Sequence, residues 1–326
     1  MIKLTTEIDL PVMTKKLGYR HQSMMIGSCF AENMGNHLQE LCFPVTINPF
    51  GILYNPVSIA NSLTMLFDRK IFTRQDLFYH DNLYHSFSHH SKFSGPSENE
   101  ILARINAHIS DAYEVLKSCS HLFITFGTSW VFRHKETGKD VSNCHKLPGT
   151  LFDRYRLTTL QITEIWAPVI QQLVRLNPQI HLVFSVSPIR HMKEGAHGNQ
   201  LSKAILLLGI DELESLFGAD LISYFPSFEI LLDEFRDYRF YAADLTHPSD
   251  VAIGLIGEKF DELFLDAEAK TVSSELKKLV RSNQHRSQNY NNIAFQLFMK
   301  KQSEDIQIFK DKYPFIDLKK IDNKCE

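Results

Sequence analysis

Short apolar runs along the chain alternate with segments in which apolar residues recur at helical spacing. Mainly apolar runs that do not alternate with polar residues, at residues 23–27, 121–126, 180–186 and 221–225, indicate strands buried on both faces. This order predicts an α/β fold, a three-layer α/β/α sandwich around a parallel sheet of about five strands. Helices are expected at residues 31–41, 57–67, 98–117, 161–176, 199–217 (with a break near Gly209), 228–235 and 251–264.

Three segments fall outside this alternation. We expect an irregular, histidine-rich segment over residues 68–97 and a loop insertion over residues 130–157. Residues 266–326 are rich in Lys, Gln and Asn and carry only a weak helical pattern. We therefore expect a main domain over residues 1–265, followed by a helical or partly mobile extension over residues 266–326.

Composition narrows the class of protein. The formal net charge is −3 and no basic stripe is present, which argues against nucleic-acid binding. No stretch approaches the roughly 20 apolar residues of a membrane span, and the N-terminus lacks the apolar run of a signal peptide. The five cysteines are odd in number, irregularly spaced and without a C-x-x-C pair, which argues against a disulfide framework or a zinc ribbon. These features predict a soluble, cytoplasmic protein.

Ser28 lies where the first apolar strand gives way to a helix. In open parallel sheets, ligands bind at the carboxyl ends of the strands, and a helix N-terminus stabilises negative charge. A serine at this place is a candidate nucleophile. The position also suits a helix N-cap, a role that serine favours and that is the commoner of the two.

Asp244 and His247 form a second candidate site in an expected loop. A serine nucleophile needs a base, usually histidine, and the histidine needs a carboxylate that fixes its tautomer. An Asp three residues before a His can place both side chains in one site. The alternative is a plain turn closed by Asp and Pro. The order along the chain, serine first and then Asp and His near the end of the α/β region, favours a catalytic set.

Several motifs point to a known family. Residues 27–31 read Gly-Ser-Cys-Phe-Ala, and further motifs lie at residues 48–51, 126–130, 143–146, 187–191 and 224–227. On these motifs the chain resembles the GSCFA family, a branch of the SGNH-hydrolase superfamily, over residues 5–265. The resemblance implies an SGNH-hydrolase-like fold in which Ser28 is the nucleophile. It also places Asp244 and His247 in the family's last motif, Asp-x-x-His.

The chain departs from the superfamily at the oxyanion hole, the set of donors that binds the negative oxygen of the transition state. The third motif of the superfamily supplies an Asn side chain, as Gly-x-Asn, but residues 127–129 read Gly-Thr-Ser. A donor of this kind is worth on the order of 3–4 kcal/mol, so substitutes are expected. The candidates are the backbone N–H groups of Ser28 and Gly51, the hydroxyls of Thr128 and Ser129, and the amide of Asn143.

Two alternatives concern other reactive side chains. Cys29 could be the nucleophile in place of Ser28, although a small buried cysteine is the commoner case. The histidines at positions 80, 85, 89 and 90 could bind a metal ion, but they form no helical pair with a supporting carboxylate. We expect a solvated loop there and no metal.

Three residues after strand ends are candidate substrate-binding residues: His145, Arg190 and His191. Arg190 could bind a substrate carboxylate or phosphate through two parallel hydrogen bonds. Equally, it could bond to loop carbonyls.

Together these features predict a serine esterase that hydrolyses an O-acyl ester, with a carbohydrate ester among the expected substrates. No metal or organic cofactor is needed. Acyl transfer on the same fold and ligand binding without turnover are the alternatives. A serine-directed phosphonate separates an enzyme from a non-catalytic binding protein, because only the enzyme has a serine reactive enough to be labelled.

Overall fold

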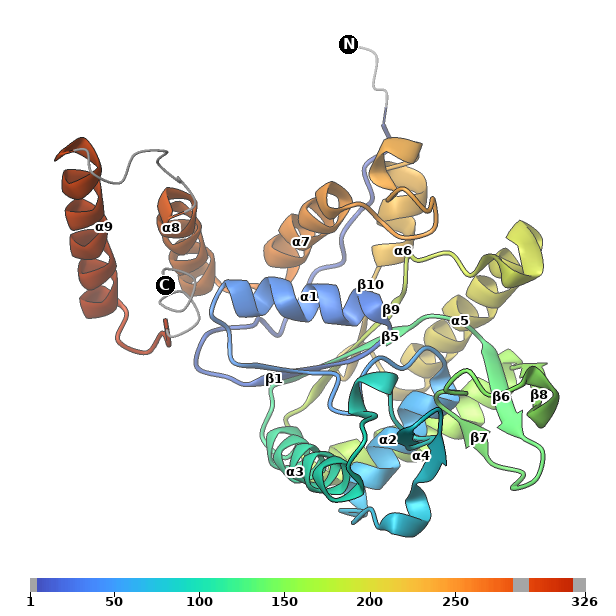
Figure 1. Cartoon of the computed structure of the whole chain (residues 1–326). Coiled ribbons are helices and arrows are strands. Elements are labelled where there is room, and N and C mark those ends of the chain that lie inside the picture. The colour runs from blue at the N-terminus through green and yellow to red at the C-terminus, as the bar shows by residue number, and fades with distance from the viewer. Residues whose placement is uncertain (1–4, 284–292, 319–326) are drawn as a thin grey trace.

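The computed structural model describes residues 5–283 and 293–318. At its centre lies a five-stranded sheet in the order β10-β9-β5-β1-β2 (Figure 1). Every neighbouring pair is parallel, so the predicted parallel sheet is confirmed. The strands are β1 (Ser23–Gly27), β2 (Val45–Ile47), β5 (His121–Phe126), β9 (His181–Val186) and β10 (Ile222–Phe225).

Helices cover both faces of this sheet. Successive strand residues point to opposite faces, so Met24 and Ile26 enter one apolar core and Met25 enters the other. The first core contains residues of α2 (Pro56–Phe67), α3 (Glu98–Leu116), α4 (Thr159–Leu176) and α5 (Gly195–Phe217). The second contains residues of α1 (Cys29–Glu40) and α7 (Asp250–Phe264). This is the three-layer sandwich that the pattern predicts (Figure 1).

The expected break near Gly209 is wrong, because α5 runs through that residue. A side chain there would meet helix α4: a Cβ built at Gly209 would lie 3.0 Å from Ile162 Cγ2. The glycine therefore allows close packing of two helices.

The expected loop insertion over residues 130–157 is a three-stranded antiparallel sheet in the order β7-β6-β8. The histidine-rich segment likewise contains a hairpin of β3 (Phe78–His80) and β4 (Leu83–His85). The insertion is built from β6 (Trp130–His134), β7 (Asp140–Val141) and β8 (Phe152–Arg156). These strands mix polar and apolar residues, so an apolar-run criterion does not detect them.

Short irregular helices complete the sandwich. The helix expected over residues 228–235 is a single turn, α6 (Ser227–Glu229), that continues as a π-helical turn (Ile230–Glu234). Single 3₁₀ turns lie at Arg74–Asp76, Ser91–Phe93, Gly149–Leu151, Met192–Glu194 and Tyr238–Phe240.

The C-terminal extension contributes α8 (Ala267–Asn283) and α9 (Ile293–Lys312). Helix α8 packs into the second core through Val272 and Leu276, and its Lys277 pairs with Asp261 of α7 at 2.8 Å. Residues 284–292 and 319–326 of the expected extension lie outside the described residues.

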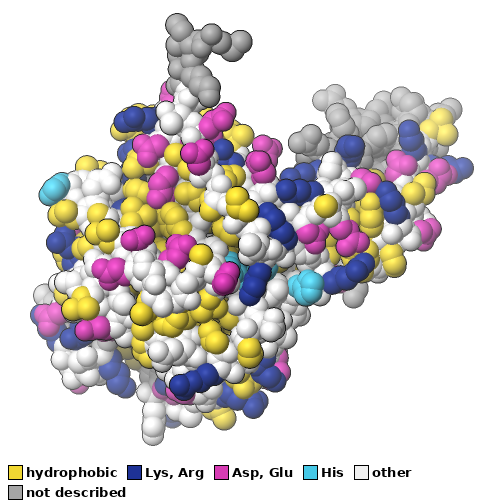
Figure 2. Space-filling model, turned by 180° about the vertical axis from the view of Figure 1, so that it is seen from behind, with side chains coloured by type: hydrophobic (Ala, Val, Ile, Leu, Met, Phe, Trp, Pro, Cys, Tyr) yellow, Lys and Arg dark blue, Asp and Glu magenta, His cyan; other side chains and the backbone are white. Residues whose placement is uncertain are grey.

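Among the helices that the structure describes, none has both the length and the apolar character that crossing a membrane requires. On the face seen in Figure 2, acidic and basic side chains are interspersed among apolar ones.

Candidate active site

The turn from β1 into α1 places Ser28 at the carboxyl edge of the sheet. Gly27 has φ +139°, and a Cβ there would lie 2.2 Å from the Thr125 carbonyl oxygen, so the turn requires glycine. Ser28 is the N-cap of α1, and its Oγ accepts a hydrogen bond from Phe30 N at 3.2 Å. Ser28 also lines a pocket. The cap and the pocket position therefore coexist in one residue.

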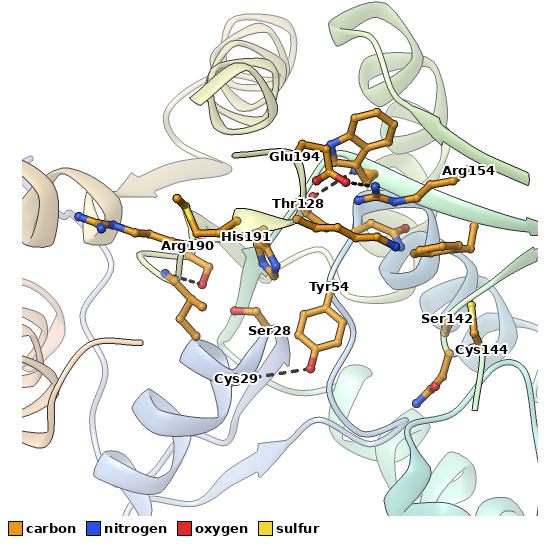
Figure 3. A pocket seen from close by; sticks show the side chains of 18 of the residues that line it. Ser28, Cys29, Tyr54, Thr128, Ser142, Cys144, Arg154, Arg190, His191 and Glu194 are labelled. Atoms are coloured by element: carbon orange, nitrogen blue, oxygen red, sulfur yellow. Dashed lines mark hydrogen bonds and ion pairs between the residues drawn. The ribbon is translucent and has the colours of Figure 1, made fainter. Parts of the chain in front are cut away.

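The pocket has a volume of about 640 Å³ and lies beyond the ends of β1, β5 and β9 (Figure 3). Its walls come from the start of α1, the segment before α2, the insertion sheet, the β9–α5 connection and the loop that holds His247. The side chains that line the pocket include Ser28, Cys29, Tyr54, Thr128, Phe132, Asn143, Arg154, Arg190, His191, Glu194 and His247.

Asp244 and His247 form a carboxylate–imidazole pair. His247 Nδ1 lies 2.5 Å from Asp244 Oδ2, and the backbone N–H groups of Thr246 and His247 donate to Asp244 Oδ1 at 2.9 and 3.0 Å. These hydrogen bonds hold the pKa of Asp244 well below its ordinary value. An ionised carboxylate on Nδ1 leaves Nε2 as the proton acceptor of a neutral imidazole.

Ser28 and His247 line the same pocket, but among the described residues no hydrogen bond joins them. The His247 side chain is 49% exposed. Its loop is anchored where Arg190 N donates to Thr246 O at 3.0 Å. A direct approach of Ser28 Oγ to His247 therefore remains a prediction.

Most of the expected oxyanion donors already have partners. Ser28 N donates to Thr125 O, and Gly51 N donates to Asn48 O at 2.7 Å. The Ser129 hydroxyl donates to Ser202 at 3.0 Å, and Thr128 Oγ1 is hydrogen-bonded to the same oxygen at 3.2 Å. Gly51 and Ser129 also lie outside the pocket lining.

Asn143 differs from these four. Its Oδ1 accepts a hydrogen bond from His145 N at 2.8 Å, which leaves the amide N–H groups without a partner among the described residues. Asn143 lines the pocket. A second donor that the motifs do not reveal is Cys29 N, an N–H group in the first turn of α1, where helices leave such groups unpaired.

Helix α5 fixes the turn that follows β5. Lys203 is 1% exposed, and its Nζ donates to Gly127 O at 2.7 Å and to Ser187 O at 2.6 Å. Burial lowers the pKa of Lys203 to about 7. Its neighbour Ser202 accepts hydrogen bonds from both N and Oγ of Ser129. The sequence predicts no role for Ser202 or Lys203. The one signal in the sequence is a lysine beside the apolar run of α5.

His191 lies beside Ser28 (Figure 3). A Cβ built at Gly127 would lie 3.4 Å from His191 Nε2 and 3.5 Å from Ser28 Cβ, so both side chains border the same small space. Burial, followed by the positive charges of Lys203, His247 and Arg154, lowers the pKa of His191 to about 4.

The other two expected substrate-binding residues are engaged elsewhere. Arg190 lines the pocket, but its Nη1 donates to Leu245 O at 3.5 Å and its guanidinium lies 4.3 Å from the Tyr241 ring centre. His145 is buried outside the pocket lining, where its Nε2 donates to Ser86 O at 2.8 Å. Arg190 therefore supports the loop before His247.

Cys29 also lines the pocket, with its Sγ 3.7 Å from Tyr54 Oη. Burial raises the pKa of the Cys29 thiol, which disfavours the nucleophilic thiolate. This environment favours Ser28 over Cys29 as the reacting group.

The expectation of a solvated histidine loop is wrong for two members of the cluster. His85 is buried and hydrogen-bonded to Ser94 at 2.7 Å, and His89 is 1% exposed with its ring stacked on Phe50. Burial lowers the pKa of His89 to about 3. In the part of the chain that the structure describes, no group of three or more His, Cys, Asp or Glu side chains could hold a metal ion.

Comparisons with known proteins give a family match and a structural match. The model of the GSCFA family matches residues 22–260, which include Ser28, Asp244 and His247. An acetyl xylan esterase, Est2A, from the rumen bacterium Butyrivibrio proteoclasticus has a similar structure, at 10% identity and a TM-score of 0.37. The match covers 83% of this chain and 66% of that structure, so the chain spans slightly less than two thirds of its length. No curated protein sequence matches the chain.

Proposed function

The chain belongs to the GSCFA family, and from this membership and the Ser28 pocket we propose that it is a serine esterase of the SGNH-hydrolase type. Ser28 is the nucleophile, His247 the base and Asp244 the residue that orients His247. The substrate is a small O-acyl ester.

The Asp244–His247 pair on the pocket that Ser28 lines carries this proposal. An imidazole whose Nδ1–H is bonded to an ionised carboxylate is prepared to accept a proton at Nε2. The Ser28 oxygen accepts from Phe30 N, and its own proton is left to donate. The N-terminus of α1 behind it favours developing negative charge.

Acylation then follows from these groups. Ser28 Oγ bonds to the ester carbon while its proton passes to His247 Nε2, and the carbonyl oxygen becomes negative. When this intermediate collapses, the bond to the alcohol oxygen breaks and His247 returns the proton to the departing alcohol. The acyl group remains on Ser28.

Deacylation repeats the same steps with water. His247 takes a proton from a water molecule, whose oxygen attacks the acyl carbon. The Ser28–acyl bond breaks, Ser28 recovers its proton and a carboxylic acid leaves. The Cys29 N–H and the Asn143 amide are the donors that we assign to the negative oxygen.

The pocket suits a small substrate. A volume of about 640 Å³ lies within the usual range for small-molecule sites. Tyr54 and Phe132 offer aromatic faces to an acyl chain or a sugar ring. Opposite charges on Arg154 and Glu194, which pair with each other, close one side. Acetylated carbohydrates are accordingly included with simple esters in the test.

The test is turnover of p-nitrophenyl acetate and acetylated sugars by the wild type and by Ser28→Ala, together with labelling by a serine-directed phosphonate. We expect wild-type turnover, loss of nearly all of it in Ser28→Ala, and phosphonate attached to Ser28. Ser118→Ala, an exposed serine at the end of α3, is the control and should match the wild type. A wild type that neither turns over any ester nor reacts with the phosphonate would contradict the proposal.

A further inference from the structure

The fold leaves a polar atom of His191 without a partner. Its Nε2 is fully buried and forms no hydrogen bond among the described residues. The backbone of His191 is fixed, because His191 N donates to Asn199 Oδ1 at 2.9 Å. Since buried polar atoms in folded proteins are nearly always paired, the unpaired nitrogen of this pocket-lining residue calls for a partner.

A partner for His191 Nε2 would lie in the space next to Gly127 and Ser28. Gly127 has no side chain, and a methyl group there would lie 3.0 Å from Tyr54 O, 3.4 Å from His191 Nε2 and 3.5 Å from Ser28 Cβ. The close view shows the His191 ring next to Ser28, with Tyr54 on the other side (Figure 3). A carbonyl group bound to Ser28 would thus have its oxygen within reach of His191.

His191 is also in the right protonation state. Burial, followed by the nearby groups Lys203, His247 and Arg154, lowers its pKa to about 4, so the His191 imidazole is neutral at neutral pH. A neutral imidazole carries one N–H and can donate a hydrogen bond without adding another charge to this cluster.

The donors of the turn after β5, residues 127–129, are already engaged. The Thr128 and Ser129 hydroxyls are held by Ser202, and the Gly127 and Thr128 N–H groups both donate to Tyr54 O, at 2.7 and 2.9 Å.

Resting on the proposed function, we propose that His191 is a further catalytic residue whose Nε2–H donates a hydrogen bond to the ester carbonyl oxygen. The bond strengthens as that oxygen becomes negative, so it favours the transition state over the bound substrate. The proton stays on His191 throughout, and no bond of the imidazole forms or breaks.

Two variants of His191 separate this role from others. His191→Leu has a similar size and no N–H, whereas His191→Gln keeps an N–H donor but takes no proton at neutral pH. For p-nitrophenyl acetate we expect His191→Leu to lower kcat about 10²–10³-fold with little change in KM. His191→Gln should recover at least about tenfold of that loss, since an amide can occupy an oxyanion hole.

His197→Leu is the matched control, because His197 is exposed on α5 and lies outside the pocket lining. Its kcat should equal that of the wild type, and thermal unfolding should confirm that all variants are folded. Wild-type-like kcat in a folded His191→Leu would overturn the inference. Equal inactivity of His191→Gln and His191→Leu would also overturn it and would make His191 a proton acceptor. These outcomes leave the esterase proposal standing, whereas a wild type without turnover or phosphonate labelling would remove both.

Discussion

The Asp244 carboxylate binds the His247 imidazole through Oδ2 and its own loop through Oδ1, with His247 Nδ1 at 2.5 Å and two backbone N–H groups at 2.9 and 3.0 Å. One side chain therefore holds both the tautomer of the imidazole and the shape of the turn. The Asp244→Asn variant separates these two roles, because it keeps one oxygen and replaces the other with an NH₂ group.

Asp244→Asn should abolish most of the activity while leaving the turn intact. The amide keeps an oxygen for the two backbone N–H groups, but its NH₂ in place of Oδ2 disfavours the Nδ1–H tautomer of His247. We expect kcat to fall by up to about 10⁴-fold, the loss known for an equivalent change in a serine protease triad. Turnover and thermal unfolding should be measured on one preparation. Near-normal turnover would limit Asp244 to closing the turn.

Cys29→Ala should keep the activity within a few-fold of the wild type. The raised pKa of this thiol keeps it protonated, so it is a poor nucleophile despite its place in the pocket. Iodoacetamide should accordingly alkylate Cys29 slowly at neutral pH, and phosphonate labelling should persist in Cys29→Ala. Loss of turnover with Cys29→Ala, but not with Ser28→Ala, would reverse the assignment.

Gly27→Ala should destabilise the fold by at least about 2 kcal/mol, because a Cβ would meet the Thr125 carbonyl oxygen at 2.2 Å in a backbone conformation with φ +139°. Gly138→Ala is the matched control. Gly138 also has positive φ, +66°, but nothing lies within 4 Å of its added Cβ, so only about 1 kcal/mol of backbone strain is expected. Urea unfolding of both variants measures the difference. Equal losses would show that backbone conformation, rather than the contact, restricts Gly27.

Lys203→Met should flatten the pH dependence of stability above neutrality. The folded pKa is about 7, below an unfolded value of about 10.4, so between these two pH values the unfolded chain binds more protons. Stability from this group therefore rises with pH across that window, by up to about 1.4 kcal/mol per pH unit. Below pH 7 the lysine is charged in both states and the slope vanishes.

The difference between wild-type and Lys203→Met unfolding free energies, measured from pH 6 to pH 10, isolates this effect from tyrosine and cysteine titration. A difference that does not vary with pH would mean that Lys203 stays charged when buried.

The central strands could be predicted because they are buried on both faces, as His121–Phe126 and His181–Val186 are. The insertion strand Trp130–His134 could not, because only Val131 and His134 are buried in it and polar residues interrupt the apolar pattern. At Gly209 the local pattern suggests a helix break. The close contact with Ile162 on another helix explains the glycine, and no local pattern contains that contact.

The candidate site likewise contains residues that the sequence could predict and residues that it could not. Ser28, Asp244 and His247 carry local signals, a strand-to-helix turn and a close pair, and they do line or border one pocket. Oxyanion donors depend on which N–H groups remain unpaired after folding, and partners distant in sequence decide that. Ser129 is engaged by Ser202, whereas His191 Nε2 is among the buried nitrogens without a partner in the described residues.

Helix α8 has a consequence for any attempt to shorten the chain. Its Val272 and Leu276 are fully buried, Ser273 is hydrogen-bonded to Tyr19 Oη at 3.0 Å, and Lys277 neutralises Asp261. A protein ending at residue 265 would expose apolar surface to water, and the Asp261 carboxylate and the Tyr19 phenol would each lose one of their partners. The yield of soluble protein should therefore drop on truncation, so a shortened chain should retain this helix although the sequence places it in an extension outside the main domain.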